Sequence, residues 1–178
     1  MSRKLILYIA TSLDGYIAKP NDDLSFLSIV QKDGEDYGYS EFVSSIDTVI
    51  LGRKTYDWIM AVVDEFPHMD KISYIITRTE RPSIGNINFY NGTLNSLVKK
   101  LKSEKGKNIF IDGGAEIVHE LLKANLIDEF IISIIPILVG DGIKLFADGR
   151  PELKLKLVTL KKFETGLIQM HYERVDND

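Results

Sequence analysis

The chain has 178 residues, a formal net charge of −4 at pH 7, 44% hydrophobic residues, 27% charged residues and no cysteine. These values indicate one globular domain, residues 1–178, and the acidic balance argues against nucleic acid or an anionic membrane surface as a partner. The absence of cysteine excludes disulfide bonds, thiolate metal sites and a cysteine nucleophile. No apolar run approaches the ~18 residues of a membrane span, so we expect a soluble, cytoplasmic protein.

Short apolar runs typical of strands alternate with helical patterns along the chain. The predicted strands cover residues 4–10, 47–52, 71–77, 87–90, 109–111, 127–135, 154–164 and 167–175. The predicted helices cover residues 36–46, 53–62, 93–104 and a segment that begins after residue 114, and long loops cover residues 11–24 and 136–146. Repeated β–α alternation followed by a hairpin predicts an α/β fold, with a mostly parallel mixed sheet, flanking helices and an antiparallel edge.

Two strand-to-helix junctions carry residues suited to binding an anion. Residues 112–114 read Asp-Gly-Gly and residues 52–55 read Gly-Arg-Lys-Thr, and each segment leads directly into a predicted helix. Adjacent glycines let the backbone approach a ligand closely, and a helix N-terminus favours a phosphate group. One such junction is also typical of an ordinary tight turn. Cations at a helix N-terminus oppose the helix dipole, so Arg53 and Lys54 indicate a compensating anion. Together the two junctions predict a nucleotide site.

Five short motifs follow one another at regular positions in the chain. They are Ser-Leu-Asp-Gly-Tyr-Ile-Ala at 12–18, Gly-Arg-Lys-Thr-Tyr at 52–56, Ile-Asp-Gly-Gly-Ala-Glu-Ile at 111–117, Leu-Ile-Asp-Glu at 126–129 and Pro-Ile-Leu-Val-Gly-Asp-Gly at 136–142. With these motifs the chain resembles the dihydrofolate reductase fold. More closely, it resembles the C-terminal reductase domain of the bifunctional deaminase–reductases of riboflavin biosynthesis, and the stand-alone relatives of that domain.

The resemblance covers nearly the whole chain and implies a fold and an activity. The implied fold is a three-layer α/β/α arrangement. The implied activity is NADPH-dependent transfer of a hydride to a small nitrogen heterocycle, either an aminopyrimidine of riboflavin biosynthesis or a pterin such as dihydrofolate. The alternative is a non-catalytic module that binds NADP without turnover.

The resemblance also assigns residues to the cofactor. Arg53, Lys54 and Arg78 would meet the 2′-phosphate, so we expect NADPH to be preferred to NADH. The glycine pair would be joined by a cis peptide and abut the cofactor, and the loop 12–24 would be a mobile lid over the nicotinamide, in which Asp14 caps its own turn. The residues expected to contact the cofactor are Ala10, Ile17, Gly52, Arg53, Lys54, Thr55, Thr77, Arg78, Gly113, Gly114, Ala115, Glu116 and Ile117.

Two carboxylates are candidates for a catalytic proton donor, because protonation of the nitrogen assists hydride transfer to a C=N bond. By resemblance, Asp36 occupies the place of an acidic residue that starts the helix after the lid, where a plain helix-start role is equally consistent. Asp112 replaces an apolar residue of the folate-reducing enzymes, so it either faces solvent in the cleft or meets a polar substrate or cofactor group. This difference favours a heterocycle smaller and more polar than folate. His68, His119 and His171 are too scattered to predict a metal site, and none is expected.

One further segment predicts self-association. Residues 130–139 are almost wholly apolar, with Pro136 at a place that suits an edge or a bend. A large exposed apolar patch is unusual on a monomer, and the reductase domains that the chain resembles commonly pair. We therefore expect a homodimer formed through this part of the chain. The alternative is an internal strand covered on both faces.

Overall fold

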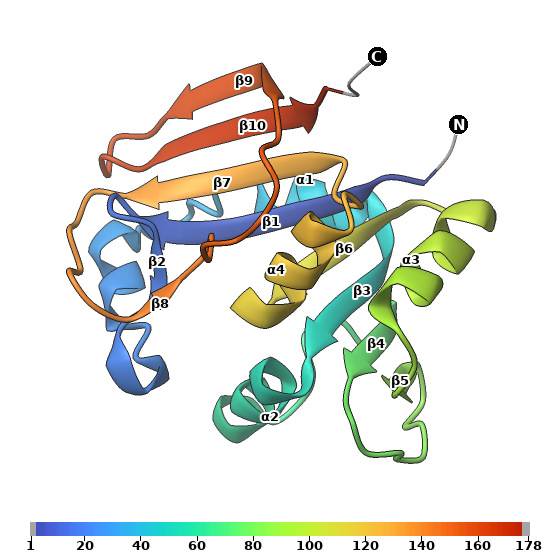
Figure 1. Cartoon of the computed structure of the whole chain (residues 1–178). Coiled ribbons are helices and arrows are strands. Elements are labelled where there is room, and N and C mark those ends of the chain that lie inside the picture. The colour runs from blue at the N-terminus through green and yellow to red at the C-terminus, as the bar shows by residue number, and fades with distance from the viewer. Residues whose placement is uncertain (1–2, 176–178) are drawn as a thin grey trace.

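The computed structural model describes residues 3–175, which contain a large mixed sheet and a small two-stranded sheet (Figure 1). In the large sheet the strand order is β5-β4-β3-β6-β1-β7-β10-β9. The strands are β1 (Leu5–Ser12), β3 (Ile46–Gly52), β4 (Ile72–Ile76), β5 (Ile87–Tyr90), β6 (Asn108–Gly113), β7 (Glu129–Ile135), β9 (Leu155–Lys162) and β10 (Ile168–Arg174). Neighbours from β5 to β7 pair in parallel, whereas β10 is antiparallel to both β7 and β9. The predicted sheet with its antiparallel hairpin is confirmed.

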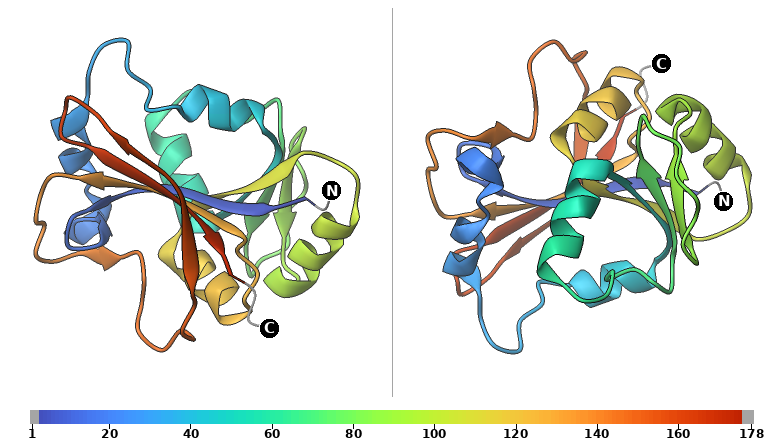
Figure 2. Two further views of the ribbon diagram at one scale, coloured as in Figure 1. Left: turned by 90° about the horizontal axis from the view of Figure 1, so that it is seen from above. Right: turned by 90° about the horizontal axis from the view of Figure 1, so that it is seen from below.

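Helices cover both faces of this sheet, which gives the expected three layers (Figure 2). On one face lie α1 (Tyr39–Ser44) and α2 (Arg53–Val62), and on the other lie α3 (Leu94–Ser103) and α4 (Ala115–Lys123). Each pair packs its buried side chains against the sheet in a separate apolar cluster. None of the helices among residues 3–175 is long and apolar enough to cross a membrane.

The sequence of α4 explains how the second layer is held in place. Its buried side chains are Ile117, Val118, Leu121 and Leu122, which recur at the spacing of one helix face. Gly114 precedes the helix with a φ of 84°, a conformation that a residue with a side chain rarely adopts. The chain therefore turns from β6 into α4 without a linker, and the start of α4 stays at the carboxyl edge of the sheet. Ligands of parallel α/β sheets bind at this edge.

Two segments differ from the predicted elements. The predicted loops contain a small antiparallel sheet, β2 (Tyr16–Ala18) with β8 (Ile143–Lys144), and short 3₁₀ helices at Pro20–Asp22 and Ser25–Val30. The helix predicted over residues 36–46 is shortened to α1. Its first residues cannot continue a right-handed helix, because Tyr37 and Gly38 have φ values of 57° and 82°.

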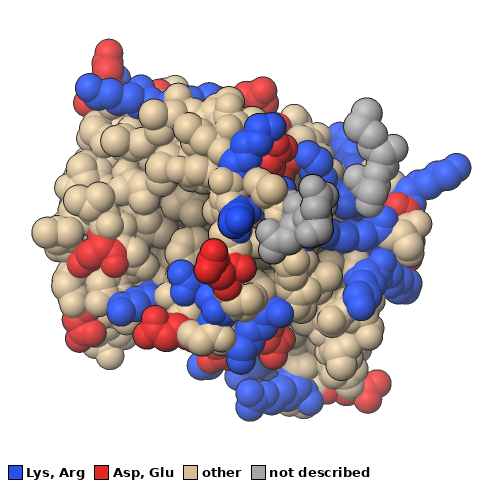
Figure 3. Space-filling model, turned by 45° about the horizontal axis from the view of Figure 1, so that its top comes forward, with Lys and Arg blue, Asp and Glu red and all other residues tan. Residues whose placement is uncertain are grey.

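The apolar run at residues 130–139 is not the exposed surface that we expected. Its first part belongs to β7, which pairs with β1 on one side and β10 on the other, and Phe130, Ile132 and Ile135 are buried. The expected exposure is therefore wrong for the strand, since an interior strand is covered on both faces, whereas Leu138 beyond the strand is 69% exposed. Exposed leucine and isoleucine side chains lie instead on the β9–β10 hairpin, whose face belongs to the broad uncharged area in Figure 3.

Candidate functional site

The N-termini of α2 and α4 lie next to each other at the carboxyl ends of β3 and β6. A Cβ atom placed on Gly114 would be 4.0 Å from the Cα atom of Gly52 and 3.5 Å from Oγ1 of Thr55. No side chain caps either helix at its N-terminus. The first backbone N–H groups of both helices consequently lack partners within their helices. Their combined dipoles create a place where an anion is stabilised.

A cavity of about 1820 Å³ opens at this edge of the sheet. This volume exceeds the roughly 300–1,000 Å³ of a typical pocket for one small ligand, so the cavity has room for two molecules. Every residue expected to contact the cofactor lines it. These residues are Ala10, Ile17, Gly52, Arg53, Lys54, Thr55, Thr77, Arg78, Gly113, Gly114, Ala115, Glu116 and Ile117.

The glycine pair differs in one respect from its expected geometry. Residues 3–175 contain no cis peptide bond, so the cis peptide expected between Gly113 and Gly114 is wrong. The chain instead turns through positive φ values at both residues, 128° and 84°, which glycine adopts readily because it lacks Cβ. Gly113 is buried and lines the cavity, and a Cβ atom on it would meet no protein atom within 4 Å. The absence of a side chain here leaves room for a ligand at the junction.

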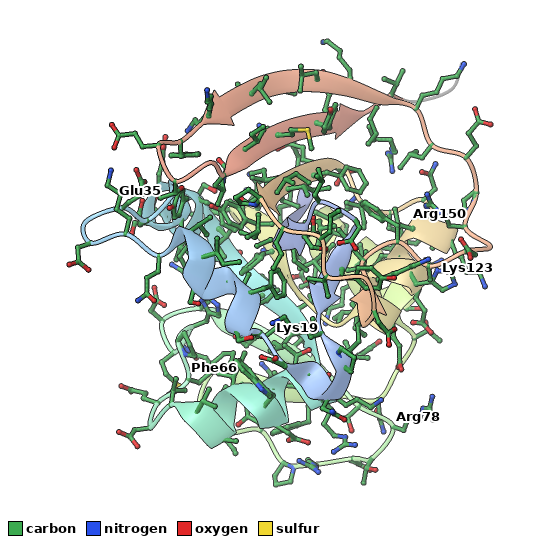
Figure 4. The ribbon with its side chains drawn as sticks, turned by 90° about the vertical axis from the view of Figure 1, so that its left-hand side faces the viewer. Lys19, Glu35, Phe66, Arg78, Lys123 and Arg150 are labelled. Atoms are coloured by element: carbon green, nitrogen blue, oxygen red, sulfur yellow. The ribbon has the colours of Figure 1, made fainter. Side chains whose placement is uncertain are left out.

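The cations of the cavity are not equally available to an anion. Arg53 donates to Asp57 at 2.7 Å, and the Lys54 ammonium lies 3.7 Å from the Glu116 carboxylate. Arg78 follows β4, is exposed and makes no ion pair or hydrogen bond with any described residue. In Figure 4 Arg78 lies on the same side of the molecule as Lys123, which also lines the cavity. Arg78 is therefore better placed than Arg53 to take up a further negative charge.

The lid loop is tied to a distant loop by the carboxylate of Asp14. This carboxylate accepts hydrogen bonds from the Ser12 hydroxyl at 2.6 Å and from the backbone N–H groups of Val139 and Gly140 at 3.0 and 2.7 Å. These bonds, first that of Ser12, lower the pKa of Asp14 to about 2. The carboxylate is then ionised throughout the neutral range. Asp14 therefore joins two loops, a larger role than the single-turn cap expected.

Directly before the glycine pair, Asp112 meets a histidine. The Asp112 side chain, at the end of β6, is 22% exposed, and its Oδ2 lies 3.5 Å from Nε2 of His68, whose side chain is 3% exposed. Tyr39 and Trp58 also line the cavity. Burial, and secondarily the charge of Asp112, raise the pKa of Tyr39. Asp112 thus lines the cleft and is partly exposed there, and its contact with His68 was not predicted.

The structure does not bring Asp36 into this cavity. Asp36 is not among the lining residues, and its carboxylate accepts hydrogen bonds from the N–H groups of Gly38 at 2.9 Å and Ser40 at 3.0 Å. Hydrogen bonding, led by the Ser40 side chain, lowers the pKa of Asp36. A carboxyl group that stays ionised at neutral pH is a poor proton donor. The geometry therefore supports the helix-start role of Asp36.

His68 belongs to this site, although nothing in the sequence predicted that it would. It lies in the segment between α2 and β4, close in sequence to Phe66, which is labelled in Figure 4. The contact with Asp112 joins segments that are far apart in the chain, and no local spacing of residues indicates it. Within residues 3–175 no group of histidine, aspartate or glutamate side chains is suited to hold a metal ion.

Comparison with known proteins finds a family model that covers most of the chain. The family model described as the RibD C-terminal domain matches residues 3–169. The chain is 43% identical to the uncharacterized protein YwjB of Bacillus subtilis over 175 residues, which are 98% of this chain and 99% of YwjB.

Two solved structures share the fold. A putative riboflavin biosynthesis protein from Shewanella sp. PV-4 superposes with a TM-score of 0.88 at 28% identity, covering 99% of this chain and 100% of the other. Dihydrofolate reductase from Enterococcus faecalis, complexed with NADP(H) and RAB-propyl, superposes with a TM-score of 0.65 at 16% identity, covering 99% of this chain and 100% of the other.

Proposed function

Because the chain belongs to the RibD C-terminal domain family, we propose that it is an NADPH-dependent reductase of a small nitrogen heterocycle, an aminopyrimidine or a pterin. The observation that carries this proposal is one cavity lined by two chemically different groups of residues. The first group comprises two uncapped helix N-termini and Arg78, and the second is a carboxylate beside a buried imidazole. The first group suits phosphate groups and the second suits a nitrogen heterocycle.

The residues of the cavity fit a dinucleotide. The free N–H groups at the starts of α2 and α4 would bind the diphosphate, and Gly113 leaves its backbone open to the ligand. Arg78 and Thr77 would hold the 2′-phosphate and the adenine ribose, while Ala10 and Ile17 would flank the nicotinamide. A bound NADPH supplies a hydride. The Enterococcus relative, solved with NADP(H), supports this choice of cofactor.

In the reaction that we propose, Asp112 supplies the proton. Its carboxyl group is partly exposed and lines the cavity, so it is accessible to a substrate nitrogen. Tyr39 and Trp58 offer aromatic surfaces for a flat ring. A carboxylate at this place favours a substrate with polar ring nitrogens.

The second candidate function is a module that binds NADP without turnover. It would use the same cofactor-binding residues.

One assay separates these two functions. Purified protein is mixed with NADPH and a panel of aminopyrimidines and pterins, and both cofactor binding and NADPH oxidation are measured. A reductase oxidises NADPH only when a suitable heterocycle is present. Tight NADPH binding without oxidation by any member of the panel would favour the non-catalytic module.

We expect NADPH to bind about tenfold to a hundredfold more tightly than NADH, because a charge-assisted contact to the 2′-phosphate contributes about 1.5–3 kcal/mol. Arg78→Ala should remove most of this preference by weakening NADPH, with NADH almost unchanged as the internal control. Arg53→Ala should act in the same direction with a smaller effect, because Arg53 already binds Asp57. Titration calorimetry with both cofactors measures the difference. Equal affinity of the wild type for the two cofactors would contradict the assignment.

We also propose a homodimer, formed through the β9–β10 hairpin instead of through β7. Leu157 and Leu160 pair across the hairpin with Tyr172 and Met170 and so share one sheet face, where they are 49% and 60% exposed. Ile168 lies on the same face and is 40% exposed. Lysines along β9 discourage edge-to-edge strand pairing, so the apolar face is the contact that we propose.

The dimer should dissociate when a charge is placed on this face. We expect light scattering at micromolar concentration to give twice the chain mass of 20.2 kDa for the wild type and the chain mass for Leu160→Lys. Ile84→Lys, at an equally exposed apolar residue beside β5 on the opposite edge of the sheet, is the matched control and should remain dimeric. A wild type of 20.2 kDa at all concentrations would show that the prediction is wrong.

A further inference from the structure

The buried imidazole of His68 is a titratable group that no step described so far uses. Its ring makes edge contacts with Phe66 and Phe110, with centroids 5.6 and 5.8 Å away. Nε2 lies 3.5 Å from Oδ2 of Asp112, and Nδ1 is buried without a hydrogen-bond partner. Leaving a buried polar nitrogen unpaired costs free energy, so a histidine at this place is not explained by packing alone.

Few charged groups face this imidazole. Asp112 meets it from β6, and Asp70, from the same segment as His68, has its pKa lowered mainly by Lys71 and least by His68. From α1, Tyr39 lies within electrostatic reach of Asp112. The aromatic neighbours carry no charge. Asp112 is therefore the acid that contacts His68, and together they form one polar unit beside the rings of Phe66 and Phe110.

Exposure differs sharply between the two members of this unit. Asp112 is 22% exposed and lines the open cavity, whereas His68 is only 3% exposed. A heterocycle bound against Asp112 would cover that carboxyl group and separate it from water. A proton needed during the reaction would then have to be present in the unit before the substrate binds.

Resting on the proposed reductase function, we propose that His68 stores the proton that Asp112 delivers to the substrate nitrogen. The carbon of the substrate C=N bond receives a hydride, which carries two electrons, from the reduced nicotinamide dinucleotide, and a C–H bond forms. The π electron pair moves to the nitrogen, and the Asp112 carboxylate takes the proton of His68 Nε2 and passes it to that nitrogen. The heterocycle is reduced, the dinucleotide is oxidised and His68 is left neutral. After the product leaves, water returns a proton through Asp112.

The test is the pH dependence of kcat in His68→Gln. Glutamine keeps an N–H donor near the position of Nε2 but cannot carry the additional proton. We expect kcat at pH 7 to fall by at least about tenfold, within the range of general acid catalysis, with the substrate KM and NADPH affinity within about twofold of the wild type. The kcat of the wild type should decline as pH rises, and the small residual kcat of the variant should not.

His119→Gln is the matched control. His119 also has a buried Nδ1 without a partner, but it lies on α4 and is not among the residues that line the cavity. Its kcat and pH profile should equal those of the wild type. A His68→Gln protein with the wild-type kcat and pH profile would overturn the role of His68.

A second measurement does not depend on the folding of a buried variant. In wild-type protein labelled with ¹³C-histidine, the ring signal of His68 should titrate with the same midpoint as kcat, and a signal that does not change over that pH range would overturn the proposal.

The proposed reductase function and the proposed proton store fail in different experiments. A wild type that oxidises no NADPH with any heterocycle contradicts the reductase, whereas an active wild type matched by His68→Gln contradicts only the stored proton.

Discussion

Asp112→Asn is expected to lower kcat by about 10²–10³-fold, while NADPH binds as tightly as to the wild type. Asparagine has almost the same shape as aspartate and retains a polar contact for His68, but its amide cannot donate a proton to the substrate as a carboxyl group does. The residues expected to bind the cofactor are other residues of the cavity, so the affinity of the protein for NADPH should not change. Steady-state NADPH oxidation with the best heterocycle of the panel gives kcat, and calorimetry gives the affinity for NADPH.

Asp36→Asn is the matched control for this variant. Both residues are aspartates that the sequence offered as candidate proton donors, but Asp36 caps the turn before α1 and does not line the cavity. We expect its kcat to stay within about threefold of the wild type, since general acid catalysis contributes far more than that. The reverse result, a large loss in Asp36→Asn and none in Asp112→Asn, would return the proton donor to Asp36.

Most of the sheet was predictable because its strands bury apolar runs that are local in the sequence. Parallel strands covered on both faces are almost continuously apolar, as in β1 and β3. The small sheet of β2 and β8 was not predictable, since its short strands pair segments more than a hundred residues apart. The burial of β7 followed from the same physics as that of β1, and the error lay in treating its apolar run as exposed.

The sequence indicates the cofactor residues of the cavity better than it indicates His68. Cofactor residues directly follow strand ends, so the pattern of strands and helices places them at one edge of the sheet, and all of them line the cavity. Arg53 and Arg78 were treated alike, although the i,i+4 spacing of Arg53 and Asp57 in a predicted helix already indicates their ion pair. His68 reaches Asp112 from an irregular segment, and such a segment has no periodicity from which its position could be inferred.

Gly142→Ala is expected to lower the free energy of unfolding by about 2–4 kcal/mol and to reduce activity by displacing the lid. Gly142 has a φ of 142°, and a Cβ atom there would lie 2.1 Å from the backbone oxygen of Ala18 and 3.0 Å from the Cα atom of Lys19. These are backbone atoms at the end of β2 and cannot turn aside as a flexible side chain does. Ile17 and Ala18 line the cavity, so separating β2 from β8 should also raise the substrate KM.

Gly140→Ala separates the steric effect from that of backbone conformation. Gly140 lies in the same loop with a φ of 82°, but a Cβ atom there would meet no atom within 4 Å. Its substitution should therefore destabilise the protein only by the roughly 1–2 kcal/mol that a left-handed residue costs, and the lid should stay in place. Chemical denaturation gives both free energies, and NADPH oxidation gives both KM values. If the two variants are equally stable and equally active, the contact between Gly142 and β2 does not position the lid.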